Sequence, residues 1–418
     1  MTRDERQQQC LEKWVESKCR STIVAVTGFG KSRIAINCIK LVLKQKPYYK
    51  VIIIVPTTGL RDQWYKHIND NGLGLNAEVI IINTASKTLH ECDLLVLDEV
   101  HLFSATTFIR IFETIKYKYI LGLTATFERL DGKHELMAKY CPVVDEVSLL
   151  ECSINGWVAP YKEYQVILDV DNIDEYKALN KQFTKHFEFF NYSFDTIMAC
   201  LGKNGYIART KLRDERCPNG NDEEKKKTYN LIMYHATQAM KLIQARKEFI
   251  NNHPKKIEIA RRIIEARSDK KIITFSNNIK MAKVIGMNGQ VYTGRDSKKR
   301  SKNIIDDFSE ASTGLLHTVK KANVGLDVPG LSVAIMLGID SSKINALQRK
   351  GRVIRREESK VAEVFVLVID QTVETEWYRK SKSNDNIITI DEKGLNDVLQ
   401  GKIPKPYLKP IKNFTFRY

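Results

Sequence analysis

Short apolar runs alternate with helical segments in two separate stretches of the chain, and this alternation limits the possible folds more than any other feature. The β-rich runs of the first stretch lie at 21–26, 51–55, 79–82, 94–97 and 119–123. Those of the second stretch lie at 271–275, 289–292, 314–317, 333–337 and 361–369. The segments between the runs have the spacing of amphipathic helices. Strands that alternate with helices form parallel sheets covered on both faces, so each stretch predicts a doubly wound α/β lobe.

The segment between the two stretches has a different character. From about residue 171 to 267 the strand signals fade, and long segments rich in Lys, Glu and aromatic residues indicate helices. A chain of 418 residues is long enough to bury more than one core. We therefore expect a first α/β lobe at 1–170, a helical insertion at 171–267 and a second α/β lobe at 268–418.

Charge and cysteine usage narrow the class of protein. The chain has 67 Lys and Arg against 50 Asp and Glu, and its formal net charge of +17 favours a polyanionic partner. Its first residues lack the apolar core of a signal peptide and no long apolar run follows, so we expect a soluble, cytoplasmic protein without a membrane partner. The 8 cysteines are scattered without a Cys-x-x-Cys pair, which indicates neither a zinc site nor a disulfide framework.

A glycine-rich loop follows the first predicted strand. It contains Thr27, Gly28 and Gly30 directly before Lys31 and Ser32. Glycines let successive backbone N–H groups face a phosphate, and the helix that follows adds its positive N-terminal end. Lys31 then reaches the outer phosphates of a nucleotide, and Ser32 is a ligand for magnesium. The loop predicts a nucleoside triphosphate site, although Ala25 stands where the general pattern has glycine.

Two acids end the apolar run at 94–97. Asp98 and Glu99 lie at the carboxyl end of that predicted strand, where open α/β sheets bind their ligands. Asp98 is placed to hold magnesium through water, and Glu99 to orient or deprotonate the attacking water. Two carboxylates on a solvated loop are the alternative, but such an apolar strand beside a phosphate loop favours the catalytic interpretation.

In this order the motifs resemble those of superfamily 2 helicases, in the branch of UvsW, RadD and XPB. The resemblance covers nearly the whole chain and implies two RecA-like lobes that use ATP and Mg²⁺. Gln7 resembles the adenine-reading glutamine of the family, although its flanking residues depart from the usual pattern and Gln8 is an alternative. The sequence from Asp98 to His101 resembles motif II in its DEVH form.

The resemblance also implies residues that contact nucleic acid. In the two lobes they are Pro56, Thr57, Thr58, Gln63, Thr84, Arg129, Ser276, Asn277 and Thr318. Leu123 to Thr126 resembles motif III, which couples hydrolysis to strand contact, and Phe127 stands where proline is usual. Trp64, beside motif Ia, either stacks on a base or packs in the core.

The second lobe carries the complementary motifs. Gly325 and Asp327 belong to a segment that resembles motif V, and Gln348 begins one that resembles motif VI, so all three are implied nucleotide contacts. Arg352 and Arg355 lie one helical turn apart on one face, so they could reach the γ-phosphate as an arginine finger. Because the lysine and acids lie on one lobe and the arginines on the other, catalysis requires the lobes to close.

These features predict an ATP-dependent DNA helicase or translocase that unwinds or remodels duplex, forked or branched DNA, with repair, recombination, replication and branch migration as the fitting processes. DNA is favoured over RNA because the Asp-Glu-Ala-Asp and Ser-Ala-Thr motifs of the DEAD-box RNA branch are absent. An RNA helicase, or an ATP-switched motor or binding subunit of a restriction or repair assembly, is the alternative.

The insertion suggests a role of its own, because two lobes need only a short linker. Helix-like segments at 175–190 and 225–251 are joined by a stretch with Arg209, Lys211 and Arg213. One hypothesis is that this basic tip clamps duplex DNA or wedges a fork. The alternative is a bundle that only stabilises the second lobe.

Overall fold

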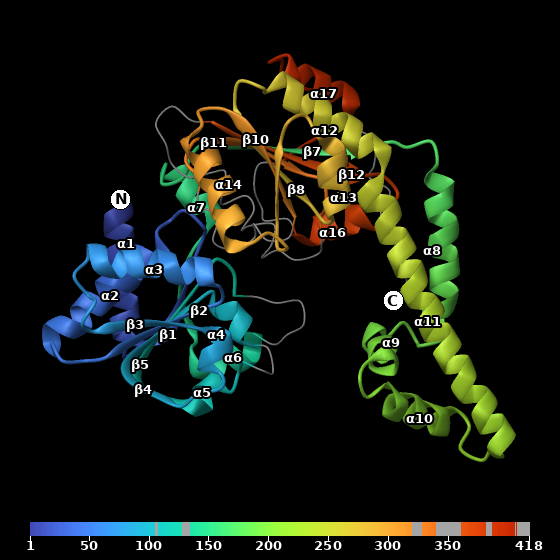
Figure 1. Ribbon diagram of the computed structural model, residues 1–418, viewed down its shortest axis with the longest axis horizontal. Helices are drawn as coiled ribbons and strands as arrows, with labels where there is room; N and C mark the ends of the chain where they lie inside the picture. The colour runs from blue at the N-terminus through green and yellow to red at the C-terminus, as the bar shows by residue number, and fades with distance from the viewer. Residues whose placement is uncertain are drawn as a thin grey trace.

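The molecule consists of two α/β lobes and a helical arm that projects from the second lobe (Figure 1). The computed structural model describes residues 1–104, 108–127, 134–319, 328–339, 361–381, 387–405 and 407. Each lobe is built on a parallel sheet, as the alternation of strands and helices predicts. Among the described residues, no helix is both long and apolar enough to cross a membrane.

The first lobe has a six-stranded sheet in the order β3-β2-β4-β5-β1-β6. Its strands are β1 (Arg20–Ala25), β2 (Val51–Val55), β3 (Ala77–Ile81), β4 (His90–Asp98), β5 (Ile115–Thr124) and β6 (Val143–Val147). Its helices are α1 (Arg3–Glu16), α2 (Lys31–Gln45), α3 (Thr58–Asp70), α4 (Ile82–Ala85), the 3-10 helix η1 (Val100–Ser104), α5 (Ile111–Thr114), α6 (His134–Tyr140) and α7 (Leu149–Ile154).

Successive side chains of the buried strands enter two different cores, which is why these strands are apolar throughout. Ile53 of β2 packs in a cluster with residues of α1, α2 and α3. Its neighbours Ile52 and Ile54 pack on the opposite face with residues of η1, α5 and α6. The sheet is therefore covered on both sides.

The second lobe has a seven-stranded sheet in the order β13-β7-β12-β11-β8-β10-β9. Its strands are β7 (Tyr161–Leu168), β8 (Lys271–Ser276), β9 (Gln290–Thr293), β10 (Gly314–Val319), β11 (Leu331–Met336), β12 (Ala362–Ile369) and β13 (Ile387–Ile390). Its helices are α12 (Pro254–Ala266), α13 (Ile279–Ile285), α14 (Lys298–Glu310), α16 (Val373–Ser381) and α17 (Glu392–Leu399).

The lobe boundaries differ from the predicted ones. We expected the first lobe to extend to residue 170, but β7 pairs in parallel with β12 and β13 of the second sheet. β7 was not predicted because polar residues interrupt its apolar sequence. These residues have distant hydrogen-bond partners: Tyr378 donates to Glu163 (2.9 Å), and Thr389 donates to Gln165 (3.0 Å). The end of the expected insertion also belongs to the second lobe, because Ile259 and Ile263 of α12 are part of its core.

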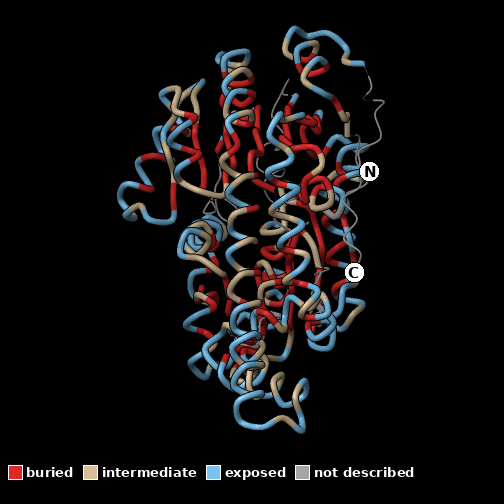
Figure 2. The backbone as a smooth tube through the Cα atoms, turned by 90° about the vertical axis from the view of Figure 1, so that its right-hand side faces the viewer, coloured by how far each residue is buried: buried red, intermediate tan, exposed pale blue. Residues whose placement is uncertain are grey.

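The arm therefore comprises α8 (Ile173–Glu188), α9 (Phe194–Leu201), α10 (Gly205–Arg216) and the 31-residue α11 (Asp222–Asn252). The two long helices match the predicted segments, while the joining stretch forms two further helices. A small core of Phe183, Phe187, Phe190, Ile197 and neighbouring residues holds the four helices together. Buried residues are concentrated in the lobes, and the arm has a largely exposed outer surface (Figure 2).

The arm is seated on the second lobe by specific contacts. Tyr176 of α8 packs with Ile250 and Val373, and its hydroxyl accepts a hydrogen bond from the N–H of Val373 (3.1 Å). At the end of α11, the side chains of Asn251 and Asn252 accept hydrogen bonds from Asn277 (3.1 Å) and Asn278 (2.9 Å) respectively. The arm base and the loop after β8 thus form one hydrogen-bonded unit.

Candidate active site

The glycine-rich loop connects β1 to α2 and curls as predicted. Gly28 and Gly30 have φ angles of 95° and 102°, in the left-handed region that favours glycine. A Cβ atom on Gly30 would lie 2.6 Å from Nε2 of Gln7, so the close approach of α1 also requires glycine here. Lys31 and Ser32 form the first turn of α2, and Lys31 Nζ donates to the carbonyl of Ala25 (3.2 Å).

The acid pair stands at the carboxyl end of β4, which is separated from β1 only by β5. Asp98 is buried, and its carboxylate accepts hydrogen bonds from Nε1 of Trp64 (2.9 Å) and the N–H of Glu99 (3.0 Å). Burial, together with the nearby charge of Glu99, raises the pKa of Asp98 to about 6, against the opposing effects of Trp64 and Lys31. A buried oxygen ligand near a phosphate loop fits a divalent cation, which would neutralise this carboxylate.

Glu99 adopts an unusual backbone conformation. Its φ angle is 54°, in the left-handed region, where a residue other than glycine is strained by roughly 1–3 kcal/mol. Its Oε2 atom is buried without a hydrogen-bond partner among the residues that the structure describes. A carboxylate oxygen in that position is available to accept a proton from water.

His101 lies between the acid pair and the end of β5. It is buried, and its Nδ1 lies 2.9 Å from Oγ1 of Thr124 at the end of β5. The same Nδ1 is 3.5 Å from Glu99 Oε2, which is too long for a hydrogen bond. Thr124 in turn donates to the carbonyl of Thr126 (2.6 Å). His101 therefore joins the segment after β4 to the end of β5.

Gln7 lies on α1 against the phosphate loop. Its Nε2 donates to the carbonyl of Phe29 (2.7 Å), whereas its buried Oε1 has no hydrogen-bond partner in the described part of the chain. An orphaned acceptor in such a place fits the exocyclic amino group of adenine, which is a donor. Arg3 reinforces the contact, because it donates to the carbonyls of Gly28 (2.6 Å) and Phe29 (2.8 Å).

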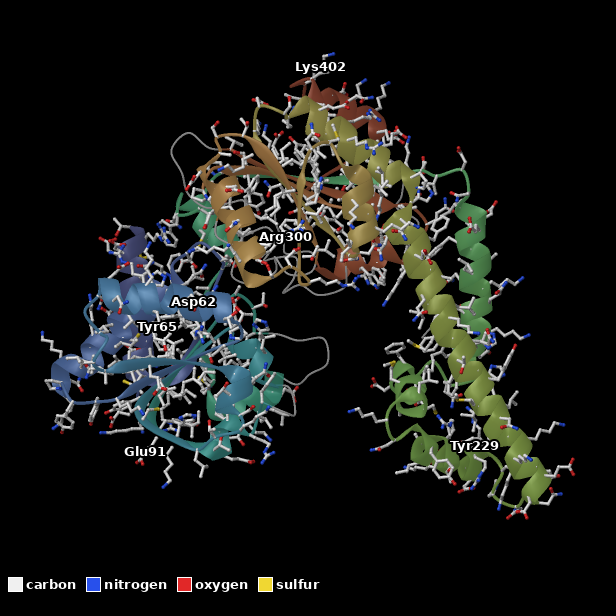
Figure 3. All side chains as sticks on the ribbon, viewed as in Figure 1. Asp62, Tyr65, Glu91, Tyr229, Arg300 and Lys402 are labelled. Carbon is white, nitrogen blue, oxygen red and sulfur yellow. The ribbon has the colours of Figure 1, made fainter. Side chains whose placement is uncertain are left out.

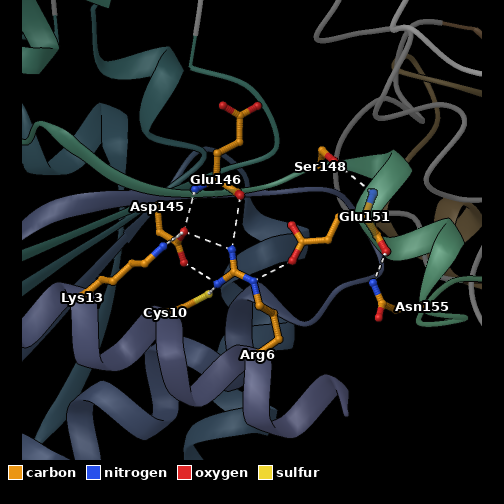
Figure 4. A network of polar contacts seen from close by, with 8 residues as sticks. All are labelled: Arg6, Cys10, Lys13, Asp145, Glu146, Ser148, Glu151 and Asn155. Carbon is orange, nitrogen blue, oxygen red and sulfur yellow. Dashed lines mark hydrogen bonds and ion pairs between the residues drawn. The ribbon is translucent and has the colours of Figure 1, made fainter. Parts of the chain in front are cut away.

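Arg6, which the sequence patterns did not single out, holds α1 in place from within a network of polar contacts (Figure 4). It is 5% exposed and forms ion pairs with Asp145 of β6 (2.5 Å) and Glu151 of α7 (2.7 Å). Lys13 also binds Asp145 (2.6 Å). Burial alone would raise the pKa of Asp145, but the hydrogen bonds from Arg6 and Lys13 outweigh it and lower the pKa to about 2. This network fixes α1, and with it Gln7, against the sheet.

The expected nucleic-acid contacts of the first lobe lie around the ends of β2 and β3. Thr57 caps α3 by accepting from the N–H of Leu60 (3.3 Å), and Pro56, Thr58 and Gln63 lie beside it, at least partly exposed. Thr84 is exposed on α4, directly after β3. In contrast, Trp64 is 1% exposed and packs in the core under Asp98, so its stacking on a base is ruled out in this structure.

The second lobe places two of its three expected contacts in the interior. Ser276 and Thr318 are each 1% exposed. Ser276 donates to the carbonyls of Asn278 (3.0 Å) and Thr318 (3.3 Å), and Thr318 donates to that of Thr274 (2.7 Å). Both hydroxyls therefore hold strands together, which corrects the expectation of direct contact in this conformation. Asn277 is partly exposed and bound to the arm.

The three basic residues expected at the arm tip differ in their surroundings. Arg209 braces α10, since it donates to the hydroxyl of Tyr229 on α11 (2.9 Å) and to the carbonyl of Cys200. Tyr229 lies toward the far end of the arm (Figure 3). Arg213 donates to Asp214 (2.8 Å). The side chain of Lys211 is 79% exposed, so of these three it is the most accessible to a phosphate.

Several predicted residues lie outside the described part of the chain. They are Arg129 after motif III, Gly325 and Asp327 of motif V, and Gln348, Arg352 and Arg355 of motif VI.

Both halves of the chain match known families. Residues 255–357 match the helicase conserved C-terminal domain, and residues 1–88 and 75–129 match the type III restriction enzyme, res subunit. The chain is 26% identical over 395 residues to the DNA 3'-5' translocase XPB2 of Sulfurisphaera tokodaii. The matched region covers 90% of this chain and 83% of that protein.

Solved structures share the fold. The helicase domain of Hef from Pyrococcus furiosus matches with a TM-score of 0.53 and 20% identity, over 90% of this chain and 97% of that one. Dbp5 of S. cerevisiae bound to RNA and ADP BeF3 matches with a TM-score of 0.58 and 13% identity, over 94% and 91%. These similarities confirm the predicted fold of two RecA-like lobes.

Proposed function

We propose that this chain is an ATP-hydrolysing helicase of superfamily 2, and more specifically a DNA translocase or helicase of the branch that contains XPB, RadD and UvsW. Its similarity to the DNA 3'-5' translocase XPB2 supports DNA as the polymer. The net charge of +17 supports sequence-independent binding to phosphates. We propose duplex or branched DNA as the substrate, in repair or a related process.

A single observation carries the proposal: the phosphate loop and the acid pair converge at the carboxyl ends of β1 and β4. ATP would be bound by the loop N–H groups and Lys31, with Gln7 reading adenine through its free Oε1. Ser32 and Asp98 would hold Mg²⁺, which supplies positive charge to the phosphate oxygens.

In the proposed reaction Glu99 accepts a proton from water, and the water oxygen forms a bond to the γ-phosphorus. The bond between that phosphorus and the β–γ bridging oxygen breaks, leaving ADP and phosphate. Negative charge spreads over the transferred oxygens, and Lys31 neutralises part of it. We propose that Arg352 and Arg355 of the second lobe neutralise the rest of this negative charge, so that closure of the lobes completes the site.

Hydrolysis would be transmitted to DNA along two routes. The contact of His101 with Thr124 passes a change at Glu99 to motif III. Lobe closure moves the arm with the second lobe, because asparagine pairs join the end of α11 to the loop after β8. We propose that the arm, with exposed Lys211, is a clamp or wedge on the DNA, while Thr57, Thr58 and Thr84 face the backbone on the first lobe.

The test is the ATPase rate of the full chain with duplex DNA, forks, single strands and RNA, each with Mg²⁺ and with EDTA. We expect DNA to stimulate the Mg²⁺-dependent rate more than RNA does. A rate that no nucleic acid stimulates would overturn the motor assignment, and stimulation by RNA alone would assign the motor to RNA.

A further inference from the structure

A cavity of about 330 Å³ lies where the arm meets the second lobe. It is lined by side chains from α8, the start of α9, α11 and α16. Half of its ten lining residues are aromatic, and Ile243, Ile250 and Val373 add aliphatic surface. The aromatic residues are Phe183, Phe187, Tyr192, Phe194 and Trp377. We refer to this cavity as the arm pocket.

Two cations from α11 complete the lining. Arg246 is 6% exposed, and its guanidinium lies over the ring of Phe183, 4.6 Å from the centroid. It also donates to the hydroxyl of Tyr176 (3.3 Å), so its position is fixed. The next residue, Lys247, is exposed at the edge of the pocket. Among the described residues that line the pocket, none is acidic.

This combination of walls selects a ligand with a flat face and a negative charge. Aromatic rings stack on nucleobases of any sequence, and a cation nearby pairs with the phosphate that each base carries. A bare anion would gain nothing from the rings, and a purely apolar segment would gain nothing from two cations. The volume is at the lower end of the range for small-ligand sites, which suits one nucleotide better than a protein helix.

The place of the pocket also fits a strand that passes between lobe and arm. Figure 1 shows α9 and α16 on the same side of α11, toward the lobes. Phe194 at the start of α9 is 45% exposed, so the pocket is open to solvent there. Because the arm is tied to the second lobe at Tyr176 and Asn251, a base held in the pocket would move with that lobe.

We propose that the arm pocket binds one unpaired nucleobase of the DNA, with the adjoining phosphate paired to Lys247. This inference rests on the proposed function, and it gives the arm a preference for unpaired strand. An unpaired base fits because a base inside a duplex offers no free face to the rings. The arm would thereby hold one separated strand while the lobes cycle.

The test uses full-length protein and two single-stranded oligomers of equal length, one of thymidines and one with an abasic backbone. Phe194→Ala removes a ring that is already partly exposed, so the fold should survive. It should weaken thymidine-oligomer binding about five- to hundredfold, the loss expected for one stacked base, and leave abasic-oligomer binding unchanged. Lys247→Ala should weaken both and reduce the salt slope of binding by about 0.7, the contribution of one phosphate contact on a single strand.

Matched controls lie on the same helices outside the pocket. Met198→Ala on α9 removes a side chain that is 44% exposed, and Lys241→Ala on α11 removes an exposed lysine. Both should bind the oligomers as the wild type does. A thymidine oligomer that carries 5-iodouracil should cross-link to Phe194, Tyr192 or Trp377 of the wild type under ultraviolet light.

The outcomes separate this proposal from the proposed function. If DNA stimulates the ATPase but Phe194→Ala keeps the wild-type preference for bases over the abasic backbone, the pocket assignment is overturned and the motor assignment stands. Cross-links confined to the two lobes would have the same meaning. If the wild type neither binds DNA nor is stimulated by it, both proposals fail.

Discussion

The nucleotide site of the first lobe and the junction of the arm with the second lobe are assembled in different ways. Asp98 is the last residue of the buried strand β4, and Lys31 follows the end of the buried strand β1 by one short loop. At the arm junction, Tyr176 binds Arg246 and Val373, which lie 70 and 197 residues further along the chain. The first site is local in its construction, whereas the second depends on how whole helices pack.

The difference has a consequence for mutation. A local site can lose its chemistry while the fold remains, because the loop and strand ends are held by backbone hydrogen bonds and two apolar cores. At a junction built from distant side chains, a substitution that changes the position of the arm also changes the stability of the fold. We therefore expect substitutions in the first lobe's site to separate activity from stability more cleanly than substitutions around the arm.

The largest effect should follow Lys31→Ala and Glu99→Gln. Each should lower ATP hydrolysis by about a thousandfold or more, since one removes charge from the phosphates and the other removes the proton acceptor. Glu99→Gln should retain and trap ATP, which filter binding measures, while Lys31→Ala should bind ATP weakly. Lys40→Ala, on the exposed side of α2, is the control. Normal turnover by either site variant would refute the assignment.

Arg352→Ala and Arg355→Ala extend the comparison to the second lobe. We expect hydrolysis to fall about a thousandfold while most ATP affinity remains, because an arginine finger acts on charge that develops in the transition state. Stopped-flow binding of a fluorescent ATP analogue would measure affinity apart from rate. Equal losses of affinity and rate would instead place these arginines in ground-state binding.

Arg6→Ala should destabilise the first lobe and loosen Gln7. It breaks a buried ion pair, at a cost of about 3–5 kcal/mol in the free energy of unfolding, which thermal denaturation would detect. The KM for ATP should rise more than kcat falls, and selectivity for ATP over GTP should decrease. Exposed Arg33, which pairs with Asp4, provides the control Arg33→Ala. Unchanged nucleotide selectivity would limit Arg6 to a structural role.

The same network predicts a dependence on pH. The folded pKa of Asp145 is about 2, below the ordinary value of 3.8, so its stabilisation is present above the unfolded pKa. It is lost as the pH falls from about 4 toward 2. Arg6→Ala should remove much of this acid sensitivity, which urea unfolding between pH 5 and pH 2 would test. A wild-type slope in the variant would exclude the Arg6–Asp145 pair as its source.

The smallest effects should come from the arm tip. Lys211→Ala should weaken DNA binding similarly for all sequences and reduce the salt slope by about one, without a change in thermal stability. Arg209→Ala should lower the thermal stability and leave the salt slope of DNA binding unchanged, because Arg209 braces α10 against Tyr229. Fluorescence anisotropy at several salt concentrations, with Lys181→Ala on α8 as control, would separate the two. If Arg209→Ala alone changed the salt slope, the roles would be exchanged.

Much of the fold could be predicted because buried parallel strands are apolar on both faces. The runs at 51–55 and 94–97 became β2 and part of β4 for this reason. β6 and β7 were missed, because Asp145 and Glu163 interrupt their apolar pattern. Those acids are accommodated in the interior because distant side chains reach them: Arg6 and Lys13 bind Asp145, and Tyr378 binds Glu163.

The sequence by itself determined where the phosphate loop and the acid pair lie along the chain relative to their buried strands. Glycine at 28 and 30, lysine at 31 and two acids at a strand end depend on the backbone next to them, so their spacing predicts a nucleotide site without knowledge of the packing. Only the tertiary structure decided that Trp64 supports Asp98 and that β7 joins the second sheet. It alone also brought aromatic residues of the arm against Trp377. Such contacts join residues far apart in the chain, and they depend on the packing of helices and strands, which no local pattern records.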